Sequence, residues 1–363
     1  MIRAADFRDP DVARQLLNRV SDTVAELSRR LTLMEVCGTH TMAIHQHGIR
    51  SLLSDQVRLV SGPGCPVCVT PVRFIDHAVA LSRQPDTIIT TFGDMMRVPG
   101  SSSSLLEEKA RGGDIRIVYS ALDAVKLAEN NPQQQIVLLG VGFETTTPTV
   151  AGAILRAESR HLENFTVLCA HKTMPAPMAA LTSDPELQID GYICPAHVST
   201  IIGTQAYLPL AEEHHVACVV TGFEPLDILQ GVAMLAGQIA AGEARVENQY
   251  RRFVAADGNP RARQMMAKVF EPCDAHWRGI GLIAASGLRI RKAFEAFDAA
   301  RKFSVTVEES QEPAGCRCGE ILKGKIGPRD CPLFGNLCTP ETPVGACMVS
   351  SEGTCAAEHK YGC

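Results

Sequence analysis

The sequence predicts an α/β fold with two parallel-sheet, Rossmann-like domains and a further C-terminal domain of helices and loops. Three observations support this prediction. Short apolar runs alternate with segments of helical period from residue 31 to residue 241. The apolar runs are continuous, which is typical of parallel strands covered by helices on both faces. The chain has 363 residues, enough for two or three compact domains.

The predicted elements follow one another in strand–helix order. A proline followed by apolar residues at helical spacing indicates a first helix within residues 10–30. Eight strands are expected, at residues 31–36, 57–60, 87–91, 115–119, 136–141, 165–170, 192–194 and 216–220. Helices are expected at residues 71–83, 104–111, 121–129, 149–160 and 225–241.

The polar segment 130–135 has the composition of a connector, so we expect it to divide the eight strands into two sheets. The predicted domains are therefore 1–130, which carries the first two cysteine loops, and 131–242, which carries a Gly-Phe-Glu-Thr-Thr loop. The remainder, 243–363, is expected to be mainly helical, because the strand pattern fades into charged segments. From residue 313 it becomes a Cys/Gly/Pro-rich tail, which we expect to be held together by something other than a hydrophobic core.

Composition excludes several classes of function. The formal net charge is only -5, and 21% of residues are charged, so no polybasic face for nucleic acid or anionic lipid is expected. The chain has no apolar run of about 18 residues and no signal-peptide pattern at its start, so we expect no membrane association and a cytoplasmic location. In that reducing compartment, structural disulfides do not account for most of the 14 cysteines.

The spacing of the cysteines separates structural from functional thiols. Four stand alone, and free cysteine is usually a buried small hydrophobe, so we expect packing roles for Cys169, Cys194, Cys218 and Cys273. The others are Cys37, the Cys65/Cys68 pair and seven thiols within residues 316–363. Cys363, beside the chain end, is expected to have no role.

Loops at the carboxyl ends of parallel strands are where ligands bind in such sheets. Four predicted loops of this kind carry polar or thiol side chains: Cys37 and His40 in the first, Cys65 and Cys68 in the second, Asp94 in the third, and Glu144 in the fourth. Helix N-termini lower the pKa of cysteine, so Cys37, Cys65 and Cys68 are expected to be nucleophiles or ligands of a soft metal. His40 is a candidate partner of Cys37. For Asp94 and Glu144, loop capping is an equal alternative.

The segment Gly-Pro-Gly-Cys-Pro-Val-Cys at 62–68 combines two thiols with residues that fix the backbone. A Cys-x-x-Cys pair can form a redox-active disulfide or bind zinc or iron. The sequence leaves these alternatives open, but it favours a functional pair over inert packing.

The tail holds six further cysteines at spacings that lack the tight Cys-x2-4-Cys knuckles of zinc sites. Wider spacings with proline and glycine turns are typical of an iron–sulfur cubane, whose four thiolates approach from different directions. A cluster is therefore favoured over zinc and over disulfides. Two of the six thiols remain for a second redox pair.

Together these segments resemble the HypD family of hydrogenase maturation factors, in order and over nearly the whole chain. The segments that carry the resemblance are 37–42 (CGTHTM), 62–70 (GPGCPVCVT), 91–100 (TFGDMMRVPG), 142–146 (GFETT), 195–203 (PAHVSTIIG), 331–335 (CPLFG) and 345–353 (GACMVSSEG). The resemblance implies a [4Fe-4S] protein that, with the small partner HypC, holds an iron atom while carbon monoxide and two cyanides are attached. HypE would supply cyanide as a protein thiocyanate, and the Fe(CN)2CO product would serve the [NiFe]-hydrogenase large subunit.

The resemblance also implies roles for individual residues. Cys37 matches the cysteine that holds iron jointly with a HypC cysteine, and Cys65 and Cys68 match the redox-active pair. By analogy with ferredoxin:thioredoxin reductase, the cluster ligands would be Cys316, Cys331, Cys338 and Cys355, with Cys318 and Cys347 as a second dithiol. Glu358 and His359 stand where aromatic residues are expected, which leaves the packing of the final helix open. The expected function is thus an assembly scaffold with redox-active thiols rather than a conventional enzyme. The alternative is a cluster-dependent protein-disulfide reductase that uses Cys65 and Cys68.

Overall fold

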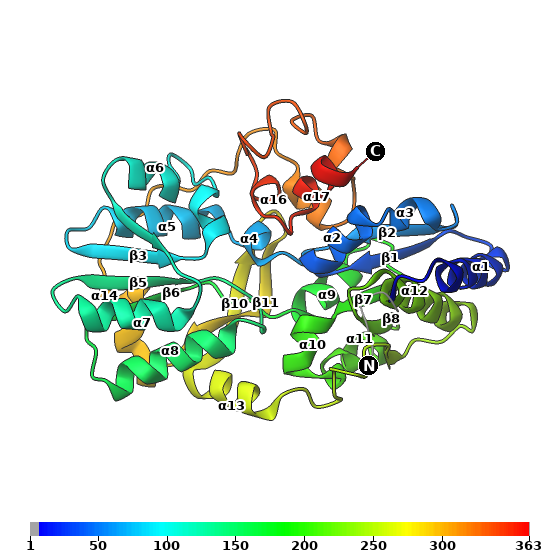
Figure 1. The fold of residues 1–363 in the computed structure, drawn as a ribbon, viewed down its shortest axis with the longest axis horizontal. Helices are drawn as coiled ribbons and strands as arrows, with labels where there is room; N and C mark the ends of the chain where they lie inside the picture. Colours follow the sequence, from blue (N-terminus) through cyan, green and yellow to red (C-terminus); the bar gives the residue numbers. More distant parts are fainter. Residues whose placement is uncertain (1–6, 363) are drawn as a thin grey trace.

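The computed structural model describes residues 7–362 as two α/β lobes side by side, with the C-terminal tail above the junction between them (Figure 1). No helix in this part of the chain is long and apolar enough to cross a membrane. Each lobe is built on one parallel sheet, as the continuous apolar runs predicted.

Sheet A has the strand order β2-β1-β7-β8-β9, and all its pairs are parallel. Its strands are β1 (Leu31–Glu35), β2 (Val57–Ser61), β7 (Gly191–Pro195), β8 (Ala217–Thr221) and β9 (Val246–Asn248). Its helices and helical turns are α1 (Pro10–Ala25), α2 (Gly38–Gln46), α3 (Ile49–Leu52), α4 (Pro66–Val69), α9 (Pro175–Thr182), α10 (Ala196–Ile202), η3 (Thr204–Tyr207), α11 (Leu208–Glu212) and α12 (Pro225–Ala240). Apolar faces of α1 and α12 pack together against the sheet.

Sheet B has the order β4-β3-β5-β6 and is also fully parallel. Its strands are β3 (Thr87–Thr91), β4 (Asp114–Ile117), β5 (Gln135–Gly140) and β6 (Phe165–Cys169). The helices and turns around it are α5 (Val72–Ser82), η2 (Gly93–Arg97), α6 (Leu105–Ala110), α7 (Ala121–Asn130), α8 (Thr147–Ser159), η4 (Lys292–Phe297) and α14 (Ala299–Lys302).

The two sheets correct the predicted division at residue 130. The strands on either side of that point, β3 and β5, pair with each other in sheet B, and the chain returns to sheet A only at β7. Each lobe is therefore built from separated segments, and the polar stretch at 130–135 is only the α7–β5 connection. Apolar runs identify strands, but they carry no information about which strand lies beside which.

The region after residue 243 also differs from expectation. Besides α13 (Pro260–Val269), it forms β9 and an antiparallel hairpin of β10 (Phe270–Trp277) and β11 (Gly281–Ile290). One face of β10 is exposed, and the strand contains a proline and two charged residues, so its period is hard to recognise in the sequence. The hairpin lies between the two lobes (Figure 1).

The tail runs as an extended segment from residue 303 and then forms short helices joined by loops. These are α15 (Cys318–Leu322), η5 (Pro328–Asp330), α16 (Ala346–Val349) and α17 (Thr354–Tyr361). Contrary to expectation, the buried part of the tail shares a hydrophobic cluster with sheet A, in which Ile321 and Met348 join Met34 and Tyr192. The final helix α17 packs against α2, and Glu358 forms an ion pair with Arg329 and lies 3.2 Å from Nε2 of His45.

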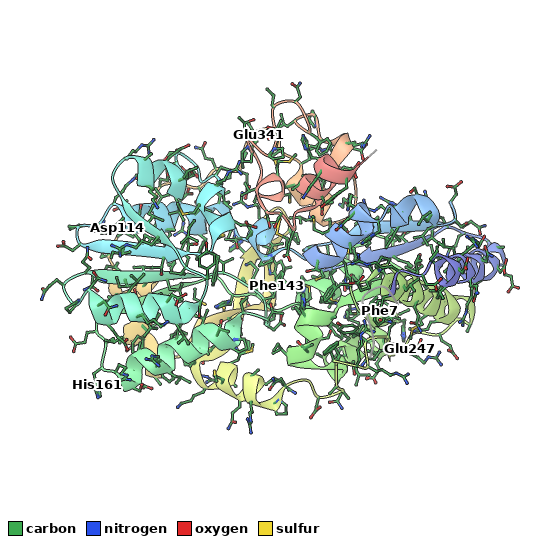
Figure 2. All side chains as sticks on the ribbon, in the orientation of Figure 1. Phe7, Asp114, Phe143, His161, Glu247 and Glu341 are labelled. Carbon is green, nitrogen blue, oxygen red and sulfur yellow. A yellow bond between two sulfur atoms is a disulfide. The ribbon has the colours of Figure 1, made fainter. Side chains whose placement is uncertain are left out.

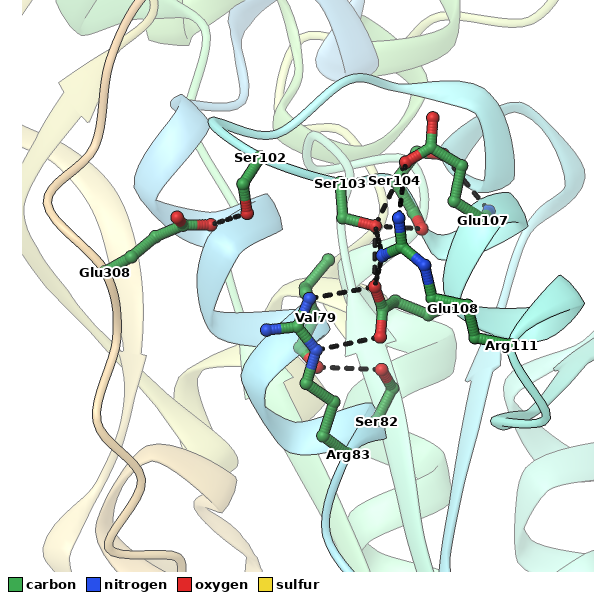
Figure 3. Close-up of polar contacts among 10 residues, drawn as sticks. All are labelled: Val79, Ser82, Arg83, Ser102, Ser103, Ser104, Glu107, Glu108, Arg111 and Glu308. Carbon is green, nitrogen blue, oxygen red and sulfur yellow. Dashed lines mark hydrogen bonds and ion pairs between the residues drawn. The ribbon is translucent and has the colours of Figure 1, made fainter.

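A polar network ties α6 to the end of α5 in the sheet B lobe (Figure 3). The buried carboxylate of Glu108 accepts hydrogen bonds from Arg83, from Arg111 and from the hydroxyl of Ser103. These partners lower the pKa of Glu108 to about 2, and the hydrogen bond from Arg83 is the largest cause. The network fixes the elements that flank the sheet, away from the thiols.

Candidate functional site

The first two cysteine loops lie side by side because β1 and β2 are adjacent parallel strands that end at the same edge of sheet A. The amide of Gly38 donates to the carbonyl oxygen of Gly64 at 3.2 Å. A β-carbon on Gly64 would stand 2.2 Å from the backbone nitrogen of Cys37. Glycine at position 64 therefore allows the Cys65/Cys68 loop to lie directly against Cys37.

Cys65 and Cys68 form a disulfide. Cys65 caps the short helix α4, and its sulfur accepts a hydrogen bond from the amide of Cys68 at 3.2 Å. Both residues are buried, at 3% and 1% exposure, so bulk solvent does not reach the pair. Arg278, in the β10–β11 turn, holds the end of this loop through hydrogen bonds to the carbonyls of Val69 and Thr70.

Cys37 stands at the N-terminus of α2, but its thiol is not activated as expected. Amides of Thr39 and His40 favour the thiolate, yet burial has the larger effect and raises the pKa of the Cys37 thiol to about 12. The carboxylate of Glu352, and to a lesser extent that of Glu35, raises it further. The expectation of a lowered pKa at Cys37 was wrong because desolvation outweighs the helix dipole. A thiol of this kind loses its proton when it binds a metal, since the metal replaces the missing solvation.

Glu35 is a site residue that the sequence analysis missed. It is fully buried at the end of β1, where its carboxylate accepts from the amide of Cys37 at 3.1 Å and from the hydroxyl of Thr41 at 2.6 Å. Burial raises the pKa of Glu35 to about 7. An acidic residue inside an apolar strand, two positions before a cysteine, was the available signal.

His40 contacts the end of β8. Its Nε2 lies 3.0 Å from the carbonyl oxygens of both Thr221 and Gly222, and its ring packs against Phe223. Burial lowers the pKa of His40 to about 4, so the ring is neutral. The backbone amide of His40 faces the Cys37 sulfur, while its ring joins α2 to β8. A role for His40 in the chemistry of Cys37 stays a prediction.

Asp94 comes close to the Cys37 helix through the tail. Its carboxylate accepts a hydrogen bond from the hydroxyl of Ser350 at 3.0 Å, and Glu352, two residues later, accepts one from Thr39 at 3.2 Å. Burial, reinforced by Asp94, raises the pKa of Glu352. Sheet A, sheet B and the tail therefore meet at Cys37. Glu352 was not identified from the sequence, because the tail's position could not be derived.

Glu144 lies elsewhere on the carboxyl edge of sheet B. It is buried, and its Oε1 accepts from the amide of Met174 at 2.9 Å. Within residues 7–362 its Oε2 has no hydrogen-bond partner, and burial raises the pKa of Glu144 to about 7. The preceding Phe143 stacks on Trp277 of the hairpin and lies at the inner side of the lobe (Figure 2). The contacts of Glu144 thus run to the α9 segment and not to Cys37.

The tail gathers its thiols around one small enclosed cavity. Five cysteines line it with Ile321, Leu333, Phe334 and Met348: Cys316, Cys318, Cys331, Cys338 and Cys355. The sulfurs of Cys316 and Cys318 are 3.2 Å apart, and the amide of Val344 donates to the sulfur of Cys338 at 3.3 Å. Within residues 7–362, no group of three or more His, Cys, Asp or Glu side chains has the spacing of ligands to a single metal ion.

Cys347 connects this cavity to the disulfide. The neighbouring thiol of Cys318, together with burial, raises the pKa of the Cys347 thiol. The preceding residue, Ala346, has its carbonyl oxygen 3.9 Å from the sulfur of Cys68. Helices α4 and α16, which carry Cys68 and Cys347, pack against each other. The helical turn that carries Cys347 therefore packs directly against the one that carries Cys68.

The remaining cysteines divide in two. Cys194 and Cys218 are buried in the core, as expected. Cys169 and Cys273 are partly exposed and line a separate cavity along the hairpin. Cys363 lies outside the described residues.

An α/β protein with a buried disulfide against a single thiol, and with six more thiols in the tail beside them, has the kind of thiol groups that redox and metal-binding proteins use. Comparison with known proteins identifies the family of this chain. The family described as "HypD: Hydrogenase formation hypA family" matches residues 11–362, and the chain belongs to this family of hydrogenase maturation factors.

Relatives described as hydrogenase maturation factors align with almost the whole chain. "Hydrogenase maturation factor HypD" of Azotobacter vinelandii is 48% identical over 364 residues, which span 98% of this chain and 96% of that relative. The protein of the same description from Escherichia coli (strain K12) is 47% identical over 363 residues, 98% of this chain and 97% of its own length. One from Rhizobium leguminosarum bv. viciae is 46% identical over 365 residues, with 98% and 94% covered.

Proposed function

We propose that this hydrogenase maturation factor is a scaffold with redox-active thiols. Together with a HypC-type partner it holds an iron atom at Cys37 while two cyanides and one carbonyl are attached, and a HypE-type partner delivers the cyanide. The observation that carries the proposal is the convergence of Cys37, the Cys65–Cys68 disulfide and the tail thiols where the two lobes meet the tail.

The chemistry of the groups that line the tail cavity supports a [4Fe-4S] cluster there. Its donors are thiols, its other walls are apolar, and an amide already donates to one of its sulfurs. Cys316, Cys331, Cys338 and Cys355 would hold the cluster, and a cubane places each thiolate on a different iron atom. When bound, the cluster supplies single electrons to the thiols beside it.

Cys318 and Cys347 would form the dithiol that reduces the buried disulfide. A thiolate of this pair attacks one sulfur of the Cys65–Cys68 bond, and the second thiol resolves the mixed disulfide. The products are a Cys318–Cys347 disulfide and two thiols at Cys65 and Cys68. Two electrons and two protons therefore pass from the tail pair to the Cys65/Cys68 pair. The contact between the Cys68 sulfur and Ala346, the residue before Cys347, supports this exchange.

The reduced Cys65/Cys68 pair would then release cyanide from a protein thiocyanate. The two thiols give two electrons and two protons and become a disulfide again. The thiocyanate becomes a free thiol and hydrogen cyanide, whose carbon binds the iron cargo once its proton is lost. Soft thiolate anchors such as Cys37 suit iron with strong-field diatomic ligands.

The carboxylates around Cys37 position it. Glu35 holds the backbone amide of Cys37, and Glu352 contacts the next turn of α2 through Thr39. Burial raises the pKa of both acids, so the ionised form of either can take up the proton that leaves the Cys37 thiol when iron binds. Asp94 would assist by holding Ser350 of the tail segment.

The alternative function is a protein-disulfide reductase that uses Cys65 and Cys68. An infrared spectrum of the protein, purified without oxygen together with its small HypC-type partner, separates the two functions. Cyanide and carbonyl stretching bands support the scaffold. Reduction of an added protein disulfide, in the absence of those bands, supports the reductase and overturns the proposal.

A further inference from the structure

A second cavity, of about 780 Å³, lies along the hairpin. Its walls come from β11 and the end of β10, from the segment after β6, from the start of α5 and from the extended tail segment. Its volume is that of a pocket for a small organic molecule. Nothing in the maturation chemistry proposed above uses it.

Two buried cations line this cavity: Lys172 has no counter-ion within ion-pair distance among residues 7–362, and Arg278 has only the exposed Glu312. Lys172 is 3% exposed, and its ammonium group donates to the carbonyl oxygen of His276. Within residues 7–362 no carboxylate lies within ion-pair distance of it. Burial lowers the pKa of Lys172 to about 8. Arg278 is also 3% exposed, and neither of its Nη atoms has a hydrogen-bond partner in this part of the chain.

The carboxylates that line the cavity either accept hydrogen bonds from backbone amides or extend into solvent. Asp274 accepts from the amide of Ala285, and Asp298 caps α14 by accepting from Ala300. Glu312 lies 3.8 Å from Nη1 of Arg278, but it is 57% exposed and reaches into solvent. A buried charge without a partner is costly, so the cavity has the electrostatic character of a site for a negative group.

Other groups that line the cavity also favour a negatively charged ligand. Helix α5 begins at the cavity, and its N-terminus has no side-chain cap. Free amides at a helix start favour an anion. Arg73 adds positive charge, whereas Arg289 is paired with Glu271; His77, His171 and His276 are the remaining titratable nitrogen groups. Phe74 and Trp277 supply an aromatic wall.

From these contacts we infer that the cavity binds a small organic anion, with a carboxylate or phosphate group held by Lys172 and Arg278 and an apolar body against Trp277. Lys172 is the better residue to test, because Arg278 also holds the Cys65/Cys68 loop. Through that second contact of Arg278, the ligand would lie beside the Cys65/Cys68 loop.

The chain contains a single tryptophan, and it reports on this site directly. The Trp277 ring centre is 5.1 Å from the ammonium nitrogen of Lys172, and its indole nitrogen is fixed by Ser286. The full-length protein is titrated with benzoate, with phenyl phosphate and with the neutral benzamide at constant ionic strength, and tryptophan fluorescence is followed. The two anions distinguish a carboxylate from a phosphate ligand, since all three probes share one apolar body.

We expect a saturable fluorescence change with at least one anion and binding of benzamide that is about tenfold weaker or more, as for loss of a charge-assisted hydrogen bond. Lys172→Met should weaken binding of that anion by a similar factor, whereas Lys268→Met, on the exposed face of α13, should not. Equal binding of benzamide and the anions, no saturable change with any probe, or unchanged anion binding by a folded Lys172→Met protein would overturn the inference. The comparison with benzamide needs no variant, so the test stands even if Lys172→Met fails to fold.

Discussion

Gly64 and Cys37 are in such close backbone contact that a β-carbon on residue 64 would lie 2.2 Å from the Cys37 nitrogen. This contact joins the disulfide loop to the helix that carries the isolated thiol. The positions of the two are therefore coupled, although they lie 27 positions apart in the sequence.

Gly64→Ala should push the two loops apart. We expect a loss of roughly 1–3 kcal/mol in the free energy of unfolding, as for overpacking in a buried site. The matched control is Gly237→Ala within α12, where an added β-carbon meets nothing within 4 Å. That control should leave stability unchanged or raise it by up to about 1 kcal/mol. Urea unfolding of the two variants measures the difference, and equal stabilities would show that the contact is not tight in solution.

Cys347→Ser should isolate the buried disulfide from reductant. Because Cys347 lies between Cys318 and the Cys68 segment, its loss removes one half of the proposed exchange pair. After reduction through the cluster, alkylation and mass spectrometry should find Cys65 and Cys68 labelled in the wild-type protein and unlabelled in the variant. Cys273→Ser, at a partly exposed thiol on the other cavity, is the control and should behave like the wild type. Full labelling of Cys65 and Cys68 in Cys347→Ser would exclude this route.

Glu108→Gln should destabilise the sheet B lobe in a pH-dependent way. The pKa of Glu108 is lowered on folding to about 2, so its contribution is present above the ordinary carboxyl pKa and is lost as the pH falls towards the folded value. The carboxylate is only 6% exposed, but Arg83 and Arg111 are 51% and 58% exposed, so solvent screens the pairs. We therefore expect a loss of about 2 kcal/mol at neutral pH.

Urea unfolding of Glu108→Gln and the wild-type protein from neutral pH down to about pH 3 tests this linkage. The difference in unfolding free energy should shrink as the pH falls. Glu107→Gln, whose carboxylate is 57% exposed on the same helix, should show little difference at any pH. A constant difference for Glu108→Gln would mean that its charge is not responsible.

How far the sequence predicts this fold depends on whether a feature is local. All eight expected strands are present within one or two residues of their predicted ends, because a continuous apolar run between turn residues is a local signal. The assignment of β3 and β4 to the same domain as β1 and β2 was wrong, because pairing depends on contacts between distant segments. The hairpin was missed because Glu271, Pro272 and Asp274 obscure the alternation of β10.

The site shows the same limit. Cys37, Cys65 and Cys68 could be placed together because adjacent parallel strands end at one edge. Glu35 and Glu352 could not, because one lies inside a strand and the other reaches Cys37 only through the packing of the tail. The high pKa of Cys37 also follows from burial, which no local pattern revealed.

The most direct test of the central claim, that Cys37 anchors the iron cargo beside a separate cluster, is the infrared spectrum of Cys37→Ala purified without oxygen with its small partner. Visible absorption of the same sample reports the cluster. Loss of the cyanide and carbonyl bands with the cluster absorption retained is the predicted result. Retention of those bands, or loss of the cluster absorption in this variant, would contradict the account.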